Sequence, residues 1–140
     1  MFKKISAEDI SASLEVSHRQ YLIGKLKLPQ ILSHIDDDNI EIGLTSYKEY
    51  NIELPHKHKM AFEYQYIISG ETKYLDLHSG EEFYYAAGDF YRIDPGTEYA
   101  QKSLEDTSIL FIKTPQGNDK VVLEQSPALK KWFSSWDAEI

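Results

Sequence analysis

The sequence contains no cysteine among its 140 residues. This absence excludes disulfide bonds, thiolate metal ligands and cysteine nucleophiles, and it fits a reducing compartment. Long apolar runs are also missing, since no stretch approaches the ~20 residues that a membrane-spanning helix needs. The N-terminal segment MFKKISAEDI lacks the apolar stretch of a signal peptide. We therefore expect a cytoplasmic protein whose chemistry uses side chains other than cysteine.

Positive charge is scarce as well, because 15 Lys and Arg stand against 23 Asp and Glu and give a formal net charge of −8. A nucleic-acid partner requires a basic stripe that binds phosphates, and the sequence offers none. The length is close to the commonest size of a single domain, so one hydrophobic core is expected. The composition therefore predicts one domain with neither a nucleic-acid nor a membrane partner.

Aromatic residues are frequent, at 13% of the chain, and ten of them are tyrosines. This favours β-strands and a cavity wall that carries hydroxyl groups. Between residues 40 and 115, short runs rich in Ile, Tyr, Phe and Thr alternate with Gly, Pro, Asp and Ser, which is typical of an all-β antiparallel sandwich or barrel. We predict seven strands, at residues 40–49, 61–69, 72–78, 81–86, 89–94, 98–103 and 107–114.

The flanks of this region predict fewer elements. In residues 1–39, SAEDISASLE could form one helical turn and SHRQYLIGKLKLP an extra strand. In residues 116–140, Ser126 is a helix N-cap and Pro127 stands at the first helical position. The apolar positions of this short helix recur at i, i+3, i+4 and i+7, as Leu129, Trp132, Phe133 and Trp136. They either cover the chain's own barrel or bury into a dimer, and the whole chain is expected to be a single domain.

One segment, LPHKHKMAFEYQYIISGE, combines three metal-binding side chains. His56 and His58 are two residues apart, so on an extended segment both imidazoles point to the same face. Glu63 can then close the site from the neighbouring strand. Two imidazoles and a carboxylate suit one divalent transition metal, Zn, Mn, Fe or Ni, and leave coordination positions open. The alternative is that the histidines are solvated side chains of a loop that also holds Lys57 and Lys59.

The wider pattern reads H-x-H-x4-E-x6-G, and it is followed by GDFYRIDPGTEY. This pair of motifs resembles the cupin superfamily over about residues 40–115. The resemblance implies an antiparallel jelly-roll β-barrel. It also implies that the two histidines and the glutamate are three ligands of a metal at the barrel mouth.

The second motif departs from the family at Tyr99, which occupies the position of the family's fourth ligand, a histidine. A neutral phenol is a weak ligand unless the metal deprotonates it. Three interpretations stay open. In the first, Tyr99 borders a site of two histidines and one carboxylate. In the second, Tyr99 is the fourth ligand. In the third, the barrel is metal-free, and His56 and His58 contact the ligand directly. Tyr99 is also a candidate catalytic acid or base.

Alternation predicts the neighbours of this site, because every second side chain of a barrel strand points inward. If Glu63 points inward, so does Gln65, and if Tyr99 points inward, so does Gln101. Both amides suit sugar hydroxyls or a carboxylate and are candidate substrate-binding groups.

Two cations, Arg92 and Lys113, are the ones best placed to reach an anionic ligand, although by parity either could face solvent. The aromatic residues that alternate with the site residues are expected to fill the core, namely Phe62, Tyr64 and Tyr66.

The resemblance implies a metal-binding cupin that acts on or binds a small polar molecule, with a sugar derivative as the expected class. An enzyme of this kind would catalyse an isomerisation, an epimerisation or an oxygen-dependent cleavage. One alternative is a non-catalytic cupin that binds or senses a carbohydrate. Another is a metal-free sugar epimerase in which a histidine is the base and Tyr99 the acid.

The stretch ILFIKTPQGNDK and the tryptophan-containing helix are similar to small cupins associated with bacterial surface-polysaccharide or nucleotide-sugar genes. As plain chemistry, the end of this stretch, Asn118-Asp119-Lys120, is a polar surface turn. An exposed barrel edge and the C-terminal helix predict a homodimer.

Overall fold

The computed structural model describes residues 1–140. Its two helices are α1 (Ala7–Val16) and α2 (Pro127–Phe133). One group of strands comprises β1 (Arg19–Gly24), β2 (Ile35–Asp36), β3 (Glu41–Tyr47), β5 (Phe62–Ser69), β8 (Phe90–Ile93) and β10 (Thr107–Thr114). The other comprises β4 (Asn51–His58), β6 (Glu71–Asp76), β7 (Glu82–Ala86), β9 (Tyr99–Ser103) and β11 (Lys120–Val122). All seven predicted strands are present, with ends that shift by at most two residues.

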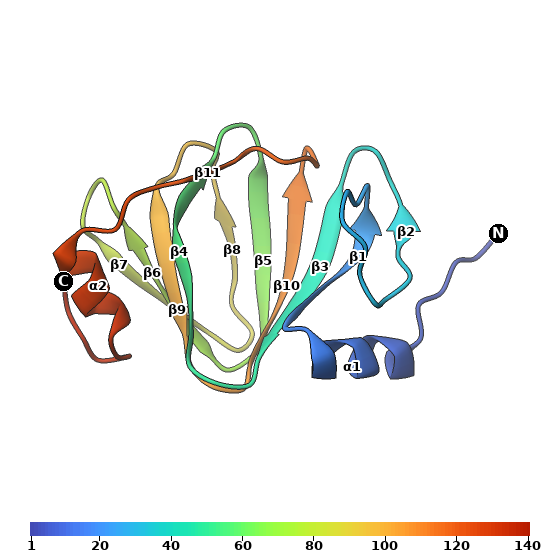
Figure 1. The fold of residues 1–140 in the computed structure, drawn as a ribbon, viewed down its shortest axis with the longest axis horizontal. Helices are drawn as coiled ribbons and strands as arrows, with labels where there is room; N and C mark the ends of the chain where they lie inside the picture. The colour runs from blue at the N-terminus through green and yellow to red at the C-terminus, as the bar shows by residue number, and fades with distance from the viewer.

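The strands form two sheets that face each other (Figure 1). The first sheet has the order β2-β1-β3-β10-β5-β8, and the second has the order β11-β4-β9-β6-β7. Every pair is antiparallel except β1 with β2. The fold is therefore the predicted jelly-roll β-barrel with a short C-terminal helix. Neither helix is long and apolar enough to cross a membrane.

Strand β4 is longer than the sequence patterns suggest. Its segment NIELPHKH includes Pro55, which cannot donate to a sheet ladder and usually marks a break. The register between β4 and β9 shifts between Glu53 and His56, and this bulge accommodates the proline. As a result, His56 and His58 lie on a strand and not in a solvated loop.

The N-terminal flank forms more structure than the single helical turn expected. Helix α1 has ten residues, and the hydroxyl of its N-cap Ser6 accepts a hydrogen bond from the backbone amide of Asp9 at 3.1 Å. Glu8 and Asp9 lie in the first turn, where negative charge is favourable. The extra strand expected after this helix is present as β1, which pairs with β3 at the edge of the first sheet.

The C-terminal helix packs on the barrel of its own chain. Ser126 caps it through the amide of Leu129 at 3.1 Å, as predicted. Trp132 is only 1% exposed and belongs to a cluster with Leu75 and Ala100 of the second sheet. Its indole N–H also donates to Glu82 at 2.8 Å. The buried face of α2 thus covers this sheet and is not available to a second copy of the chain.

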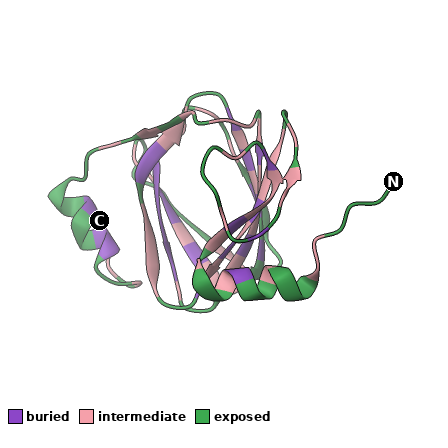
Figure 2. Cartoon of the chain, turned by 45° about the vertical axis from the view of Figure 1, so that its right-hand side comes forward, coloured by how far each residue is buried: buried purple, intermediate pink, exposed green.

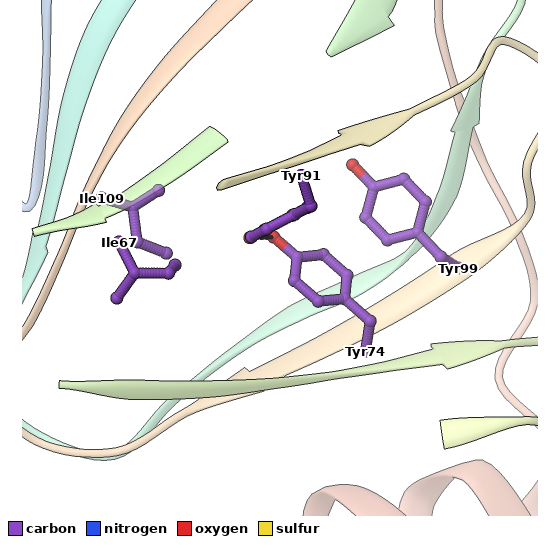
Figure 3. Packing of buried hydrophobic residues seen from close by; sticks show 5 residues of the cluster. All are labelled: Ile67, Tyr74, Tyr91, Tyr99 and Ile109. Carbon is purple, nitrogen blue, oxygen red and sulfur yellow. Dashed lines mark hydrogen bonds between the residues drawn. The ribbon is translucent and has the colours of Figure 1, made fainter. Parts of the chain in front are cut away.

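The barrel interior is filled at one end by Ile67, Tyr74, Tyr91, Tyr99 and Ile109. Figure 3 shows the ring of Tyr74 between those of Tyr91 and Tyr99, with centroid distances of 5.3 and 5.5 Å. Buried residues recur along the strands of both sheets, whereas α1 is mostly exposed (Figure 2). Much of the tyrosine content therefore serves the barrel core.

The aromatic residues that alternate with the site residues on β5 do not fill this core. Tyr66 is exposed, Tyr64 stacks on Phe90 of β8, and Phe62 lies under the guanidinium of Arg92. Because Glu63 points inward, its sequence neighbours point outward. The prediction that they are core filler was wrong.

Candidate metal centre

A cavity of about 1050 Å³ lies between the two sheets, beside the packed tyrosine cluster. His56 and His58 of β4 and Glu63 of β5 all line it. Their nearest ligand atoms lie within 4.8 Å of one another. Two strands of opposite sheets thus bring the three predicted ligands together at one place.

The two imidazoles are oriented by hydrogen bonds at their Nδ1 atoms. His56 Nδ1 lies 2.7 Å from the carbonyl oxygen of Leu54, and His58 Nδ1 lies 2.8 Å from a carboxylate oxygen of Asp119. Carbonyl and carboxylate oxygens can only accept, so both Nδ1 atoms carry the proton in the neutral rings. The Nε2 lone pairs are then left facing the cavity.

Each Nε2 atom lies beside an oxygen atom of another side chain. His58 Nε2 lies 3.2 Å from Glu63 Oε1, and His56 Nε2 lies 3.0 Å from the hydroxyl oxygen of Tyr99. The same hydroxyl lies 2.7 Å from Glu63 Oε1. When both rings are neutral, the hydroxyl of Tyr99 is the one donor among these side chains, and it donates to Glu63.

Burial raises the free-energy cost of leaving these acceptor atoms without a hydrogen-bond donor. His56 is 5% exposed and Glu63 is 9% exposed. Burial lowers the pKa of His56, so a second proton on this ring is disfavoured. A cation placed among the two imidazoles and the carboxylate would satisfy all three acceptors at once. The donor set and its orientation fit a divalent metal ion.

The Tyr99 phenol is neutral. It is 4% exposed, and burial, together with the nearby carboxylate of Glu63, raises its pKa well above the usual value. Tyr99 is thus placed to donate a hydrogen bond to Glu63, one of the predicted metal-binding side chains. Its hydroxyl contacts two of the three predicted ligands.

Asp119 was not predicted as a site residue, because the sequence identified it only as part of a polar turn. Its carboxylate accepts from His58, from Lys113 Nζ at 3.1 Å, and from the backbone amides of Met60 and Ala61 at 3.0 and 2.9 Å. Burial alone would raise the pKa of Asp119, but these hydrogen bonds lower it below its usual range. Asp119 is therefore an ionised group that orients His58 from behind.

The two predicted amides line the cavity. The side-chain oxygen of Gln65 accepts from the hydroxyls of Tyr74 and Tyr91 at 2.8 and 2.9 Å. The side-chain nitrogen of Gln101 donates to the hydroxyl of Thr72 at 2.9 Å. Both amides are held in fixed orientations by buried hydroxyl groups.

The two predicted cations lie in different places. Lys113 is buried, lines the cavity and also donates to the carbonyl oxygen of Gly117. Arg92 is on the outer face of β8, where it pairs with Asp94 at 2.7 Å, and it does not line the cavity. Its neighbour Tyr91 points inward instead, so the parity of β8 keeps Arg92 out of the site.

One protein family matches part of this sequence. The family described as "Cupin domain" matches residues 46–113. No curated protein matches the chain.

Three solved structures are similar in fold. KdgF from Halomonas sp. has a TM-score of 0.55 at 17% identity, with 72% of this chain and 80% of that chain covered. An uncharacterised conserved protein with a double-stranded β-helix domain from Klebsiella pneumoniae has a TM-score of 0.54 at 19% identity, covering 64% and 78%. Oxalate decarboxylase from Bacillus subtilis has a TM-score of 0.51 at 21% identity, with 61% of this chain but only 24% of that chain covered.

Proposed function

This chain is a small protein of the cupin superfamily, and from that premise we propose that it binds one divalent transition metal through His56, His58 and Glu63 and holds a small polar molecule beside it. The expected class of molecule is a sugar derivative. The observation that supports the metal is the convergence of two imidazoles and one carboxylate, whose ligand atoms lie within 4.8 Å of one another.

A metal at these residues would supply Lewis acidity and a template for oxygen atoms of the bound molecule. The chain's own groups complete the site. Tyr99 holds its proton against Glu63, where it can be donated to a bound oxygen, and Asp119 keeps His58 in the orientation that presents Nε2. The surrounding tyrosine cluster excludes water from one side of the cavity.

The test is metal analysis of protein purified without a histidine tag. We expect one metal per chain in the parent and loss of the metal in His56→Ala and His58→Ala. His78→Ala is the matched control, because His78 is exposed and away from the cavity. A parent protein that binds no metal after incubation with Zn, Mn, Fe or Ni would contradict the proposal.

A metal-free sugar epimerase is the second candidate, and one contact favours it. His56 Nε2 and the Tyr99 hydroxyl are 3.0 Å apart, which is the distance of a base and acid that can exchange a proton. Solvent deuterium incorporation at a sugar carbon, unaffected by a chelator, would select this candidate. A thermal shift with a carbohydrate but no turnover would instead select a non-catalytic binding cupin.

We also propose a homodimer and a role in surface-polysaccharide or nucleotide-sugar metabolism. The edge strands β2, β8, β11 and β7 have unpaired sides that can support association, although the buried face of α2 is already covered. Size-exclusion chromatography with light scattering tests the dimer. The involvement of Asp119 in the site favours a functional role for the Asn118-Asp119-Lys120 segment over a plain surface turn.

A further inference from the structure

The side chains that line the cavity are less acidic than the chain as a whole. Its lining contains five cationic side chains, Arg19, Lys25, Lys27, Lys113 and Lys120. It contains three carboxylates, Glu41, Glu53 and Glu63. With neutral histidines the lining has a formal charge of +2, whereas the whole chain has −8. A lining without the chain's overall negative charge does not repel an anionic ligand.

Two of these cations are already paired by carboxylates outside the lining. Lys113 pairs with Asp119 and Lys25 pairs with Asp38, both at 3.1 Å. Lys27 and Lys120 have no ion-pair partner. Arg19 is the cation of the lining that bridges the two sheets, and its geometry limits what the cavity can bind.

Arg19 reaches from β1 of the first sheet to Glu53 on β4 of the second sheet. Its Nε donates to the hydroxyl of Thr45 at 3.0 Å, and its Nη2 donates to Tyr47 and to Glu53. These contacts fix the plane of the guanidinium. None of these hydrogen bonds uses Nη1, which has two N–H groups, and Arg19 lines the cavity.

Gln65 also has unused donors. It is 7% exposed, and its oxygen is occupied by the hydroxyls of Tyr74 and Tyr91. Its side-chain nitrogen has no protein partner and is not sealed from the cavity. This amide nitrogen is open to the cavity, where water or a ligand can accept its hydrogen bonds.

We propose that Arg19 is an anchoring residue for a carboxylate group of the ligand, with Gln65 donating to an oxygen nearer the metal-binding residues. The ligand is then a polyhydroxy carboxylate of monosaccharide size. This assignment rests on the proposed function only in placing the other end of the ligand at His56, His58 and Glu63. Glu53 faces Gln101 on β9 and His56 faces Tyr99, so the two ends are about two strand positions apart, ~7 Å.

A carboxylate fits this place better than a phosphate. Glu53 already shares the guanidinium, so a second anion at Nη1 also meets the Glu53 charge. A singly charged, planar carboxylate is repelled less than a dianionic phosphate and can lie in the plane of the guanidinium beside Nη1. A sugar phosphate is therefore one of the probes in the test.

The test compares three probes that differ only at carbon six, D-glucuronate, D-glucose and D-glucose 6-phosphate. Binding is measured by calorimetry on metal-loaded and on chelator-treated protein. We expect glucuronate to bind about tenfold or more tightly than glucose, because a charge-assisted hydrogen bond discriminates by that amount. Glucose 6-phosphate should bind more weakly than glucuronate.

The variant is the double change Arg19→Gln with Glu53→Gln, which avoids leaving one buried charge unpaired. We expect it to keep its metal content and to bind glucuronate and glucose equally. Arg92→Gln is the matched control, since Arg92 lies on the outer face, and it should bind like the parent. A circular-dichroism melt confirms that both variants are folded.

Failure of the proposed function can be distinguished from failure of the carboxylate assignment. A parent without metal would contradict the proposed function, while the preference for glucuronate in metal-free protein still tests Arg19. Equal binding of glucuronate and glucose by the parent, no binding of glucuronate up to its solubility, a preference that survives in the double variant, or tighter binding of the phosphate would each overturn the carboxylate assignment.

Discussion

The hydroxyl of Tyr99 lies 2.7 Å from Glu63 Oε1 and 3.0 Å from His56 Nε2. The sequence resemblance assigns this position to a fourth metal-binding histidine. Burial and the charge of Glu63 raise the pKa of Tyr99, so the phenol keeps its proton at neutral pH. A protonated phenol that donates to one ligand supports that ligand and does not compete with it for the metal.

Tyr99→Phe should therefore retain one metal per chain with an affinity about tenfold weaker, which is the usual effect of losing a hydrogen bond to a ligand. Tyr99→His should bind the metal more tightly than the parent because it adds a fourth ligand. Competition against a chromophoric chelator measures both. Complete loss of metal in Tyr99→Phe would instead identify Tyr99 as a ligand.

Asp119 has the same kind of role on the other side of the site. Asp119→Asn removes the charge that orients His58 and also leaves Lys113 without its ion-pair partner. We expect metal affinity to fall about 10- to 100-fold at neutral pH. Asp94→Asn is the control, because Asp94 pairs with Arg92 on the outer face and should leave metal affinity unchanged. Equal effects of the two changes would show that Asp119 acts only through general electrostatics.

Much of the barrel was predictable because local chemistry determines it. The strand runs end at Gly, Pro and Asp residues, and these supply the turns. Alternation from Glu63 correctly placed Gln65 in the cavity, and alternation from Tyr99 placed Gln101 there. Ser126 and Pro127 predicted the start of α2 for equally local reasons.

The rest depends on long-range pairing that a single sequence does not reveal. Asp119 meets His58 only because β11 pairs with β4, and Arg19 meets Glu53 only because the two sheets face each other. Pro55 concealed β4, since a proline normally argues against a strand interior. A short strand such as β8 contains too few residues to fix its parity, so Arg92 remained a candidate until the pairing was known.

The ring of Phe111, which lines the cavity, packs against the backbone of Gly43. A Cβ built there would lie 2.3 Å from the ring of Phe111, which is far below a normal contact. Gly43→Ala should therefore displace the ring and destabilise the protein by about 1–3 kcal/mol, as overpacking does. Thermal unfolding measures this cost. Adding Phe111→Leu should recover part of the loss, and no recovery would mean that the ring is not the obstacle.

Lys102 fixes the C-terminal segment to the barrel. The residue is 0% exposed, and its Nζ donates to the carbonyl oxygens of Trp132, Ser135 and Ala138 at 2.8, 2.9 and 3.0 Å. Lys102→Met leaves these carbonyls without their donor, so we expect the free energy of unfolding to fall by about 2 kcal/mol or more. Lys73→Met is the control, because the half-buried Lys73 donates to only one carbonyl, that of Trp136, and it should cost less.

The same lysine predicts a pH dependence. Burial lowers the pKa of Lys102 from 10.5 to about 8. Between pH 8 and 10.5 the unfolded chain therefore holds a proton that the folded chain has released, so the contribution of Lys102 to stability rises with pH across this window. The tyrosines titrate in both proteins, and the difference in unfolding free energy between parent and Lys102→Met isolates the lysine. We expect this difference to grow from pH 8 to 10.5, and a constant difference would show that the three carbonyls keep the ammonium charged.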